Sequence, residues 1–336
     1  MTHSVPERFR ALRIHNDEGG YRAGVETVPL DELDSGDLTI KAEYSSVNYK
    51  DALAGTGKGK ILRRFPMNGG IDVAGTVVAS QSDRFRPGDQ VLVTGAGLSE
   101  TRDGGYAEYL RIDSRWTLAL PDGLSLRESM VLGTAGFTAA LSLHRMEISG
   151  QSPADGPVLV TGASGGVGSI AIDLLASNGY EVHAVSGKRD RFDWLKRLGA
   201  SECIARDELP LSQKPLDSAR WAGCIDSVGG EMLSGICAQI SPWGNIASCG
   251  LAGGIKLNTT VMPFIIRGVS LIGIDSPTCP YAIRETVWRK LAREWKPRHL
   301  DEIGRLEVGL DGLSERFDAM LAGKSLGRTV VRLGSD

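Results

Sequence analysis

A glycine-rich turn carries the clearest chemistry in the sequence. It reads Ala163-x-Gly165-x-x-Gly168, with alanine at the first glycine position of the usual dinucleotide-binding pattern. An apolar strand-like run at 157–161 precedes it, and a helix-like run follows it. In that context Gly165 lets the backbone approach a pyrophosphate, Gly168 lets the helix pack on the strand, and the helix N-terminus supplies N–H donors. The turn predicts a dinucleotide site, the alternative being a purely structural tight turn.

The segment about twenty residues further on indicates which dinucleotide binds. An NAD enzyme usually places an acidic residue there, against the ribose 2′-hydroxyl. This chain has Ser186-Gly187-Lys188-Arg189 instead, and its first acid, Asp190, comes later. A hydroxyl and two cations suit a 2′-phosphate, so NADP(H) is predicted over NAD(H). The alternative for the two cations is a solvated helix start.

Two kinds of sequence pattern surround these motifs and predict the fold. Residues 10–121 contain short alternating segments separated by turn residues, as at 38–42 and 90–94, which indicates a small β-barrel. From residue 157 onward strand-like and helix-like runs alternate, which predicts a doubly wound parallel sheet covered by helices on both faces. A final strand-like run at 329–333 can return to the first region. Helix-like stretches lie at 129–143, 192–198, 231–239, 283–291 and 313–321.

Composition and charge exclude several classes of protein. The chain has 336 residues, 41% hydrophobic and 24% charged, which is typical of globular proteins. Its 38 Lys and Arg against 41 Asp and Glu leave no cationic field, so no nucleic-acid partner is predicted. No apolar run approaches the roughly 18 to 20 residues that cross a membrane, and charged residues interrupt 1–13. Neither a signal peptide nor a membrane anchor is expected.

The five cysteines indicate reduced thiols and a cytoplasmic protein, because they are far apart and form no C-x-x-C pair. Three of them lie in apolar strand-like runs, where free cysteine is usually a small buried hydrophobic residue. These three are Cys203, Cys224 and Cys249.

Seven segments of the chain match a known family in order. They are SVNYKDAL at 46–53, GKGK at 57–60, GIDVAGT at 70–76, GTAGFTA at 133–139, TGASGGVG at 161–168, CGLAGG at 249–254 and TVMPFI at 260–265. Through them the chain resembles the zinc-free medium-chain dehydrogenase/reductases, and among these the acrylyl-CoA reductase branch, formerly labelled quinone oxidoreductases. The resemblance implies an α/β protein with a GroES-like β-barrel catalytic domain at 1–130 and 278–336 and a Rossmann NADP-binding domain at 131–277. It also implies an active site in the cleft between these domains and a homodimer through the edge strand of the nucleotide domain.

The resemblance further implies which residues contact NADPH. Taken alone, Arg206 is best interpreted as an exposed arginine at a strand end. The resemblance implies instead that Arg206 is a second cation that binds the adenosine phosphate. The implied cofactor-binding residues are Tyr49, Ala163, Ser164, Gly165, Gly166, Val167, Gly168, Ser186, Gly187, Lys188, Arg206, Leu251, Ile265 and Ser276.

No metal is expected. The zinc-bearing relatives place a cysteine ligand where this chain has Asn48 and a histidine ligand where it has Ile71. Neither an amide nor an alkyl side chain replaces those ligands. The cysteine quartet of the relatives' structural zinc lobe is missing as well.

The implied activity is NADPH-dependent reduction of the C=C bond of acrylyl-CoA to propanoyl-CoA. That reaction needs hydride at Cβ, stabilisation of the developing enolate oxygen and a proton at Cα. Tyr49 is the first candidate for proton donor or positioner, with Asn48 and Lys50 as further candidates and Asp51 placed to orient one of them. Two alternatives stay open: Tyr49 only stacks on the nicotinamide while water supplies the proton, and Asp51 and Asp72 make structural hydrogen bonds.

The substrate assignment has competitors. An NADPH:quinone or general enone reductase is possible on the same scaffold, because fold and cofactor do not determine substrate. A non-catalytic NADPH-binding protein is a third possibility, against which the complete Asn48-Tyr49-Lys50-Asp51 segment speaks. The stretch 58–64 carries four cations in seven residues, which suits the phosphates of coenzyme A, although such a run is more often simply solvated.

Overall fold

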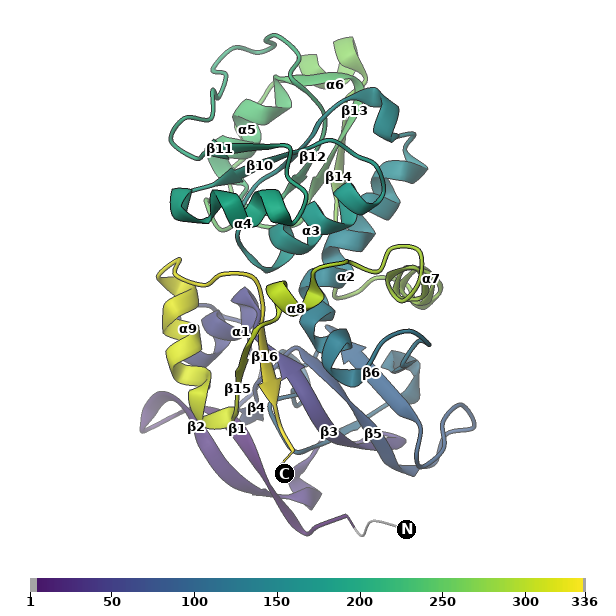
Figure 1. Ribbon diagram of the computed structural model, residues 1–336. Coiled ribbons are helices and arrows are strands. Elements are labelled where there is room, and N and C mark those ends of the chain that lie inside the picture. Colours follow the sequence, from purple (N-terminus) through teal and green to yellow (C-terminus); the bar gives the residue numbers. More distant parts are fainter. Residues whose placement is uncertain (1–4, 335–336) are drawn as a thin grey trace. The chain divides into compact units, whose positions relative to one another are not determined.

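Two units make up the chain in the computed structural model, which describes residues 5–334 (Figure 1). Unit 1 comprises Met1–Thr134, Pro277–Ala292 and Leu300–Asp336, and unit 2 comprises Ala135–Ser276 and Arg293–His299. Residues 1–4 and 335–336, which the sequence assigns to the catalytic domain, lie outside the described residues.

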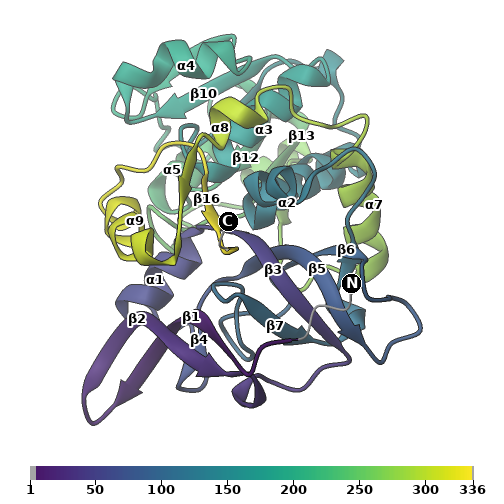
Figure 2. The same cartoon turned by 60° about the horizontal axis from the view of Figure 1, so that its bottom comes forward.

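Unit 1 is built mainly on antiparallel strands. Its strands are β1 (Arg8–Asp17), β2 (Gly20–Pro29), β3 (Leu38–Ser46), β4 (Met67–Asn68), β5 (Asp72–Ser80), β6 (Gln90–Thr94), β7 (Tyr109–Ile112), β8 (Leu118–Ala119), β15 (Leu306–Val308) and β16 (Thr329–Arg332). One sheet runs β15-β16-β3-β5-β6-β8, with β7 also paired to β3, and a smaller one runs β2-β1-β4 (Figure 2). Val330 lies opposite Ser46, so the C-terminal strand returns to β3, as the sequence predicts.

The core of unit 1 follows from the alternation in its strands. Leu38, Ile40 and Ala42 of β3 share one buried cluster with Val73 and Val77 of β5, because every second side chain of a strand points to the same face. The helices of this unit are α1 (Tyr49–Thr56), α7 (Tyr281–Leu291), α8 (Leu300–Ile303) and α9 (Leu313–Leu321), with short 3₁₀ turns η1 (Leu30–Glu32), η2 (Ser114–Trp116) and η5 (Leu310–Gly312).

Helices α1 and α9 pack closely, which fixes the position of α1 within unit 1. A Cβ on Gly55 would lie 2.3 Å from the ring of Phe317, so only glycine permits this approach. Helix α2 (Leu126–Ile148) starts in unit 1 and continues into unit 2, and its helical backbone is interrupted at Gly133.

Unit 2 is a parallel sheet with connecting helices. Its strands are β9 (Val158–Val160), β10 (Val182–Ser186), β11 (Glu202–Ala205), β12 (Trp221–Asp226), β13 (Ile240–Ser248) and β14 (Ser270–Gly273). Its helices are α3 (Gly166–Ser177), α4 (Phe192–Arg197), α5 (Gly230–Cys237) and α6 (Met262–Arg267), with 3₁₀ turns η3 (Pro153–Asp155) and η4 (Arg189–Arg191).

The strand order of unit 2 is that of a dinucleotide-binding fold. The order is β11-β10-β9-β12-β13-β14, and all of these neighbours pair in parallel. The direction of winding reverses between β9 and β12, so right-handed crossovers place α3 and α4 on one face and α5 on the other. The predicted Rossmann fold is confirmed.

The structure agrees only in part with the burial expected for Cys203, Cys224 and Cys249. Throughout residues 5–334 all five are free thiols; Cys224 and Cys237 are buried, whereas Cys203 and Cys249 are partly exposed. None of the helices in the same range is long and apolar enough to cross a membrane.

Candidate active site

The glycine-rich turn between β9 and α3 forms a cradle of backbone. Gly162 takes the left-handed conformation with φ of +59°, one residue before Ala163, which explains why alanine is accommodated at 163. Gly165 is the N-cap of α3, and a Cβ on Gly168 would lie 2.5 Å from the Gly162 carbonyl oxygen. Because the first N–H groups of a helix have no acceptor within it, the turn offers donors to an anion. These features fit a pyrophosphate.

Ser186, the last residue of β10, links this turn to the neighbouring strand. Its hydroxyl donates to Ser164 Oγ at 3.1 Å and accepts the Lys188 N–H at 3.1 Å. Arg206 follows β11; its N–H donates to the Ser186 carbonyl, and its guanidinium lies 3.3 Å from the place of a Cβ on Gly187. These polar groups therefore meet at the carboxyl ends of two adjacent parallel strands, where such sheets bind ligands.

Other charges around Ser186 are engaged in ion pairs. Arg189 pairs with Asp207 and Glu208, each at 2.9 Å, and Asp190 pairs with Arg191 at 3.0 Å. Arg189 is therefore committed to two carboxylates, and the cations that adjoin Ser186 are Lys188 and Arg206. Burial lowers the pKa of Lys188.

Three further residues predicted to contact the cofactor lie elsewhere in unit 2. Leu251 follows β13 and Ile265 belongs to α6; they are 57% and 74% exposed, which leaves apolar surface available to a ring. Ser276 is buried, and its hydroxyl accepts a hydrogen bond from Thr138 Oγ1 at 2.8 Å. The predicted cofactor-binding residues near Ser186 therefore form one cluster. Leu251, Ile265 and Ser276 come later in the chain and make none of the contacts described for that cluster.

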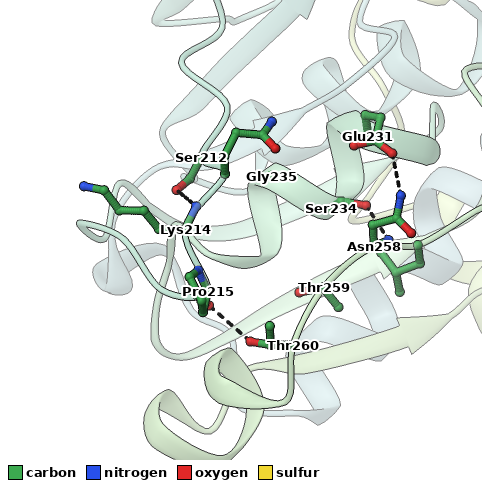
Figure 3. Close-up of a pocket in the computed structure, with 11 residues that line it drawn as sticks. Ser212, Lys214, Pro215, Glu231, Ser234, Gly235, Asn258, Thr259 and Thr260 are labelled. Carbon is green, nitrogen blue, oxygen red and sulfur yellow. Dashed lines mark hydrogen bonds between the residues drawn. The ribbon is translucent and has the colours of Figure 1, made fainter.

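A polar pocket of unit 2 is formed by residues 212–215, α5 and residues 257–260 (Figure 3). Asn258 donates through its side chain to Glu231 Oε1 at 2.7 Å and through its N–H to Ser234 Oγ at 2.9 Å. Thr260 Oγ1 donates to the Pro215 carbonyl at 3.4 Å. These bonds fasten residues 257–260 to α5 and to residues 212–215, so these polar groups of the pocket serve the fold.

Tyr49 begins α1, three residues after Ser46, the last residue of β3. Asn48 precedes it as the N-cap, and the Asp51 carboxylate accepts the Asn48 N–H at 2.9 Å and the Asn48 side-chain amide at 3.1 Å. Tyr49 is 43% exposed, whereas Asn48 and Asp51 are 7% and 1% exposed. Of the three residues predicted as catalytic, only Tyr49 is open to a ligand.

A buried hydrogen-bond network surrounds Asp72. Its Oδ2 accepts the Ser46 hydroxyl at 2.7 Å, the Asn48 side-chain amide at 2.8 Å and the Thr134 N–H at 2.9 Å. Its Oδ1 accepts the Thr134 hydroxyl at 2.6 Å. Asn48 thus bridges the two carboxylates of Asp51 and Asp72, so the cap of α1 is fixed to the sheet through β5.

Arg328 supplies the positive charge of this network. It is 2% exposed, and its guanidinium donates to Ser46 Oγ at 2.6 Å and Asn48 Oδ1 at 3.1 Å, while lying 3.9 Å from the Asp72 carboxylate. It also donates to the carbonyls of Val47 and Val131. Sequence reasoning missed Arg328, because a lone arginine before a strand carries no local signal of burial.

Gly133 permits this network to close. Its φ of +48° and ψ of −153° interrupt α2, and a Cβ there would lie 2.6 Å from both Asp72 Oδ2 and Ser46 Oγ. Any other residue at 133 would displace the carboxylate or the hydroxyl.

Two family models match the chain, and their ranges include Tyr49 and Ser186. Residues 34–122 match the alcohol dehydrogenase GroES-like domain, and residues 166–293 match the zinc-binding dehydrogenase model. The probable acrylyl-CoA reductase AcuI of Escherichia coli strain K12 is 45% identical over 97% of this chain and 100% of its own length. The chain belongs to the medium-chain dehydrogenase/reductase superfamily.

Two other members of this superfamily are similarly close. The yhdH oxidoreductase of Salmonella enterica, solved in complex with NADP, is 46% identical with a TM-score of 0.94 over 97% of this chain and 100% of its own. The putative quinone oxidoreductase YhfP of Bacillus subtilis is 44% identical over 97% of this chain and 99% of its own, and its crystal structure has NAD bound, with a TM-score of 0.94.

Asn48 and Ile71, which stand where zinc ligands are expected in the metal-dependent relatives, do not suit zinc. Asn48 uses its amide to join two carboxylates, and Ile71 donates its backbone N–H to Asp51 Oδ1 at 2.9 Å. Zinc sites need thiolate, imidazole or carboxylate ligands in a tetrahedral set. In the described part of the chain no group of three or more His, Cys, Asp or Glu could hold a metal ion.

Asp51 is the unusual acid of the network. Burial raises the pKa of Asp51 to about 7, the charge of Asp72 adds to the rise, and the N–H donors of Asn48 and Ile71 oppose it. The pKa of Tyr106 is raised well above its usual value, first by burial and then by the same two carboxylates. The network therefore contains two acids and one guanidinium, and a proton on Asp51 balances the charge.

We expect Asp51 to make stability depend on pH. The folded chain retains the Asp51 proton up to about pH 7, whereas the unfolded chain loses it near pH 4. Its contribution is complete below about pH 4 and is lost as the pH rises through about 7, by at most about 1.4 kcal/mol per pH unit. Urea unfolding across this range should give a steeper loss of unfolding free energy for the wild type than for Asp51→Asn. Parallel profiles would contradict the assignment.

Proposed function

We propose that this chain is an NADPH-dependent acrylyl-CoA reductase, which reduces the C=C bond of acrylyl-CoA to give propanoyl-CoA. The observation that carries the proposal is the 45% identity to AcuI over 97% of the chain, which includes both predicted sites. The Ser186, Lys188 and Arg206 cluster supports NADPH as the reductant, as does the NADP in the yhdH complex.

The proposal assigns a different role to each of the two units. Unit 1 is the GroES-like catalytic domain, and unit 2 is the NADP-binding domain. The sequence predicts divisions at 130/131 and 277/278, whereas the units divide at 134/135 and 276/277, and Arg293–His299 belong to unit 2. When bound, NADPH supplies the hydride that Cβ of the substrate receives. In unit 2 the residues proposed to hold it are Ala163, Ser164, Gly165, Gly166, Val167, Gly168, Ser186, Gly187, Lys188, Arg206, Leu251, Ile265 and Ser276.

Tyr49 is the residue of unit 1 that we assign to the chemistry. The residue is 43% exposed, and its hydroxyl has two successive roles. It donates a hydrogen bond to the developing enolate oxygen, and it then gives its proton to Cα of the substrate and regains one from solvent. Asn48 and Asp51 are buried and bonded to each other, so they act as positioning residues that fix the first turn of α1.

Steady-state kinetics with NADPH tests the proposal. The highest kcat/KM is expected with acrylyl-CoA, compared with crotonyl-CoA and a benzoquinone. A higher value with the benzoquinone would instead make the chain a quinone oxidoreductase, the second candidate, which the name of YhfP favours. NADPH absorbance that does not decay with any activated alkene would leave a non-catalytic NADPH-binding protein.

The double variant Ser186→Asp/Lys188→Ala should bind NADPH more weakly. The 2′-phosphate would meet an anion and lose a cation, and charge-assisted contacts of this kind are worth about 1.5 to 3 kcal/mol each. We expect NADPH affinity to fall by about ten- to a hundredfold or more, while NADH affinity is retained or improved. NADPH titration of both proteins measures the effect, and an unchanged NADPH KM would refute the NADP assignment.

We also propose that the chain forms a homodimer through the edge of the unit 2 sheet. In the described sheet β14 is the last strand and pairs only with β13. A strand at the edge of a sheet carries backbone groups that can pair with another chain. Three large apolar side chains of unit 2, Trp243, Val261 and Ile266, are 81%, 64% and 58% exposed. Sedimentation equilibrium should give about twice the 35.9 kDa chain mass; a single species near the chain mass would exclude the dimer.

A further inference from the structure

The segment that follows α1 carries four exposed cations, and the structure separates one of them from the other three. Arg64 forms an ion pair with Asp34 and lies 3.8 Å from Asp103. The side chains of Lys58, Lys60 and Arg63 have no hydrogen-bond or ion-pair partner among residues 5–334. We call these three residues the basic loop cluster.

The acids near this segment are already engaged. Glu100 pairs with Lys50 at 2.5 Å, with both side chains less than a third exposed. Asp34 forms an ion pair with Arg64 and also accepts a hydrogen bond from the Asp103 N–H. Asp103 in turn accepts a hydrogen bond from the Asn68 N–H. The positive charge of the basic loop cluster is therefore not compensated by these neighbouring carboxylates.

The backbone that carries the cluster is held in place. The Tyr21 hydroxyl donates to the Ala54 carbonyl, and its ring meets Phe65 edge-on with centroids 5.7 Å apart. Leu62 is buried beside Ala54, and the Arg63 N–H donates to the Glu100 carbonyl at 2.8 Å. Apolar side chains thus anchor the segment while its cations stay in solvent, an arrangement that lowers the cost of ordering it around a ligand.

The cluster is separated from Tyr49 by the length of α1. The helix has eight residues, which at 1.5 Å per residue spans roughly 12 Å. It ends at Gly57, whose φ is +70° and where a Cβ would lie 2.8 Å from the Tyr21 ring. Coenzyme A has a similar division, because its pantetheine arm separates the acyl thioester from the pyrophosphate and the 3′-phosphate. One unit therefore offers a hydroxyl for the acyl end and, away from it, cations for the phosphates.

We infer that Lys58, Lys60 and Arg63 bind the phosphate groups of the coenzyme A moiety, an inference that rests on the proposed acrylyl-CoA reductase function. Anionic phosphate oxygens accept charge-assisted hydrogen bonds from ammonium groups as point charges and from guanidinium in a bidentate fork. Arg64 takes no part, because Asp34 already holds it. The cluster makes the enzyme select a thioester of coenzyme A over an enone or a quinone that lacks phosphate.

The test compares acrylyl-CoA with acrylyl-pantetheine, which has the same reacting thioester and no nucleotide phosphates. In the variant Lys58→Gln/Lys60→Gln/Arg63→Gln we expect the KM for acrylyl-CoA to rise by about ten- to a hundredfold while kcat is kept. Kinetics with acrylyl-pantetheine should not change. The control Arg86→Gln/Arg111→Gln/Arg305→Gln removes equal charge from other parts of unit 1, and its KM for acrylyl-CoA should stay within about twofold of the wild type.

Each other outcome has a definite meaning. An unchanged KM for acrylyl-CoA in the cluster variant, or an equal loss with both thioesters, overturns the phosphate site. A wild type that uses both thioesters with equal kcat/KM also overturns it and leaves the reductase function intact. A wild type that reduces a benzoquinone and neither thioester removes the proposed function itself.

A measurement on the wild type covers the case in which the triple variant does not fold. Raising the salt from about 0.05 to 0.5 M shortens the range of exposed charges, so the KM for acrylyl-CoA should rise while that for acrylyl-pantetheine stays constant. A salt-insensitive KM for acrylyl-CoA refutes the inference.

Discussion

Tyr49→Phe should lower kcat for acrylyl-CoA by about 10²- to 10⁴-fold, the range that general acid catalysis contributes. The substitution keeps the ring and its exposed position at the start of α1 and removes only the hydroxyl. NADPH affinity should therefore be retained, and kcat and kcat/KM should fall together, because the lost interaction belongs to the transition state. Stopped-flow oxidation of NADPH under single-turnover conditions measures the chemical step directly.

Tyr49→Ala separates the hydroxyl from the ring. If Phe is nearly as active as the wild type and only Ala is impaired, Tyr49 is a wall that positions the reactants and the proton comes from solvent. Lys50→Met is the matched control at the next residue, since Lys50 is held by Glu100 and should affect the rate far less than Tyr49.

Arg328→Met should destabilise unit 1 by about 3–5 kcal/mol, the cost of removing one member of a buried ion pair. Asp72 is 0% exposed, and without the guanidinium its charge would remain buried beside Asp51, with Ser46 Oγ and Asn48 Oδ1 losing a donor. The free energy of unfolding in urea measures the loss. Arg10→Met, which breaks the exposed pair with Asp311, is the control, and it should cost less than about 1 kcal/mol.

A second substitution tests the cause of the destabilisation. Arg328→Met/Asp72→Asn removes both buried charges, so it should recover part of the loss of the single variant. If the double variant is less stable by the sum of two independent losses, the two side chains are not coupled and the network is not held by charge.

Local patterns in the sequence were sufficient for most elements of unit 2. Alternating apolar runs, breakers and helical spacing predicted the order of strands and helices, because each crossover unit is built from residues near one another in the chain. In unit 1 the helix predicted at 313–321 and the strand predicted at 90–94 have the same bounds in the structure, as α9 and β6. The short elements α1 and β14 were not predicted, since eight and four residues carry too little periodicity.

The glycine-rich turn shows what a motif leaves out. The pattern located the turn and its helix, and the left-handed residue of the turn is Gly162, which lies just before the pattern. Gly133 was visible only as part of a family segment, and its reason lies in the 2.6 Å approach to Asp72 and Ser46. A sequence records that glycine is present and does not record what lies beside it.

The sequence by itself determined the two fold types, the backbone cradle and the polar residues after β10, because those depend on neighbours along the chain. The tertiary structure alone decided which charges meet. Arg328 reaches Asn48 across 280 residues, Lys50 meets Glu100 across 50, and Arg64 meets Asp34 across 30. Those pairings make Asn48 and Asp51 buried supports and leave Tyr49 exposed. They also leave three cations of one loop without an ion-pair partner among residues 5–334. Electrostatic energy depends on distance and burial in space, and spacing along the chain fixes neither.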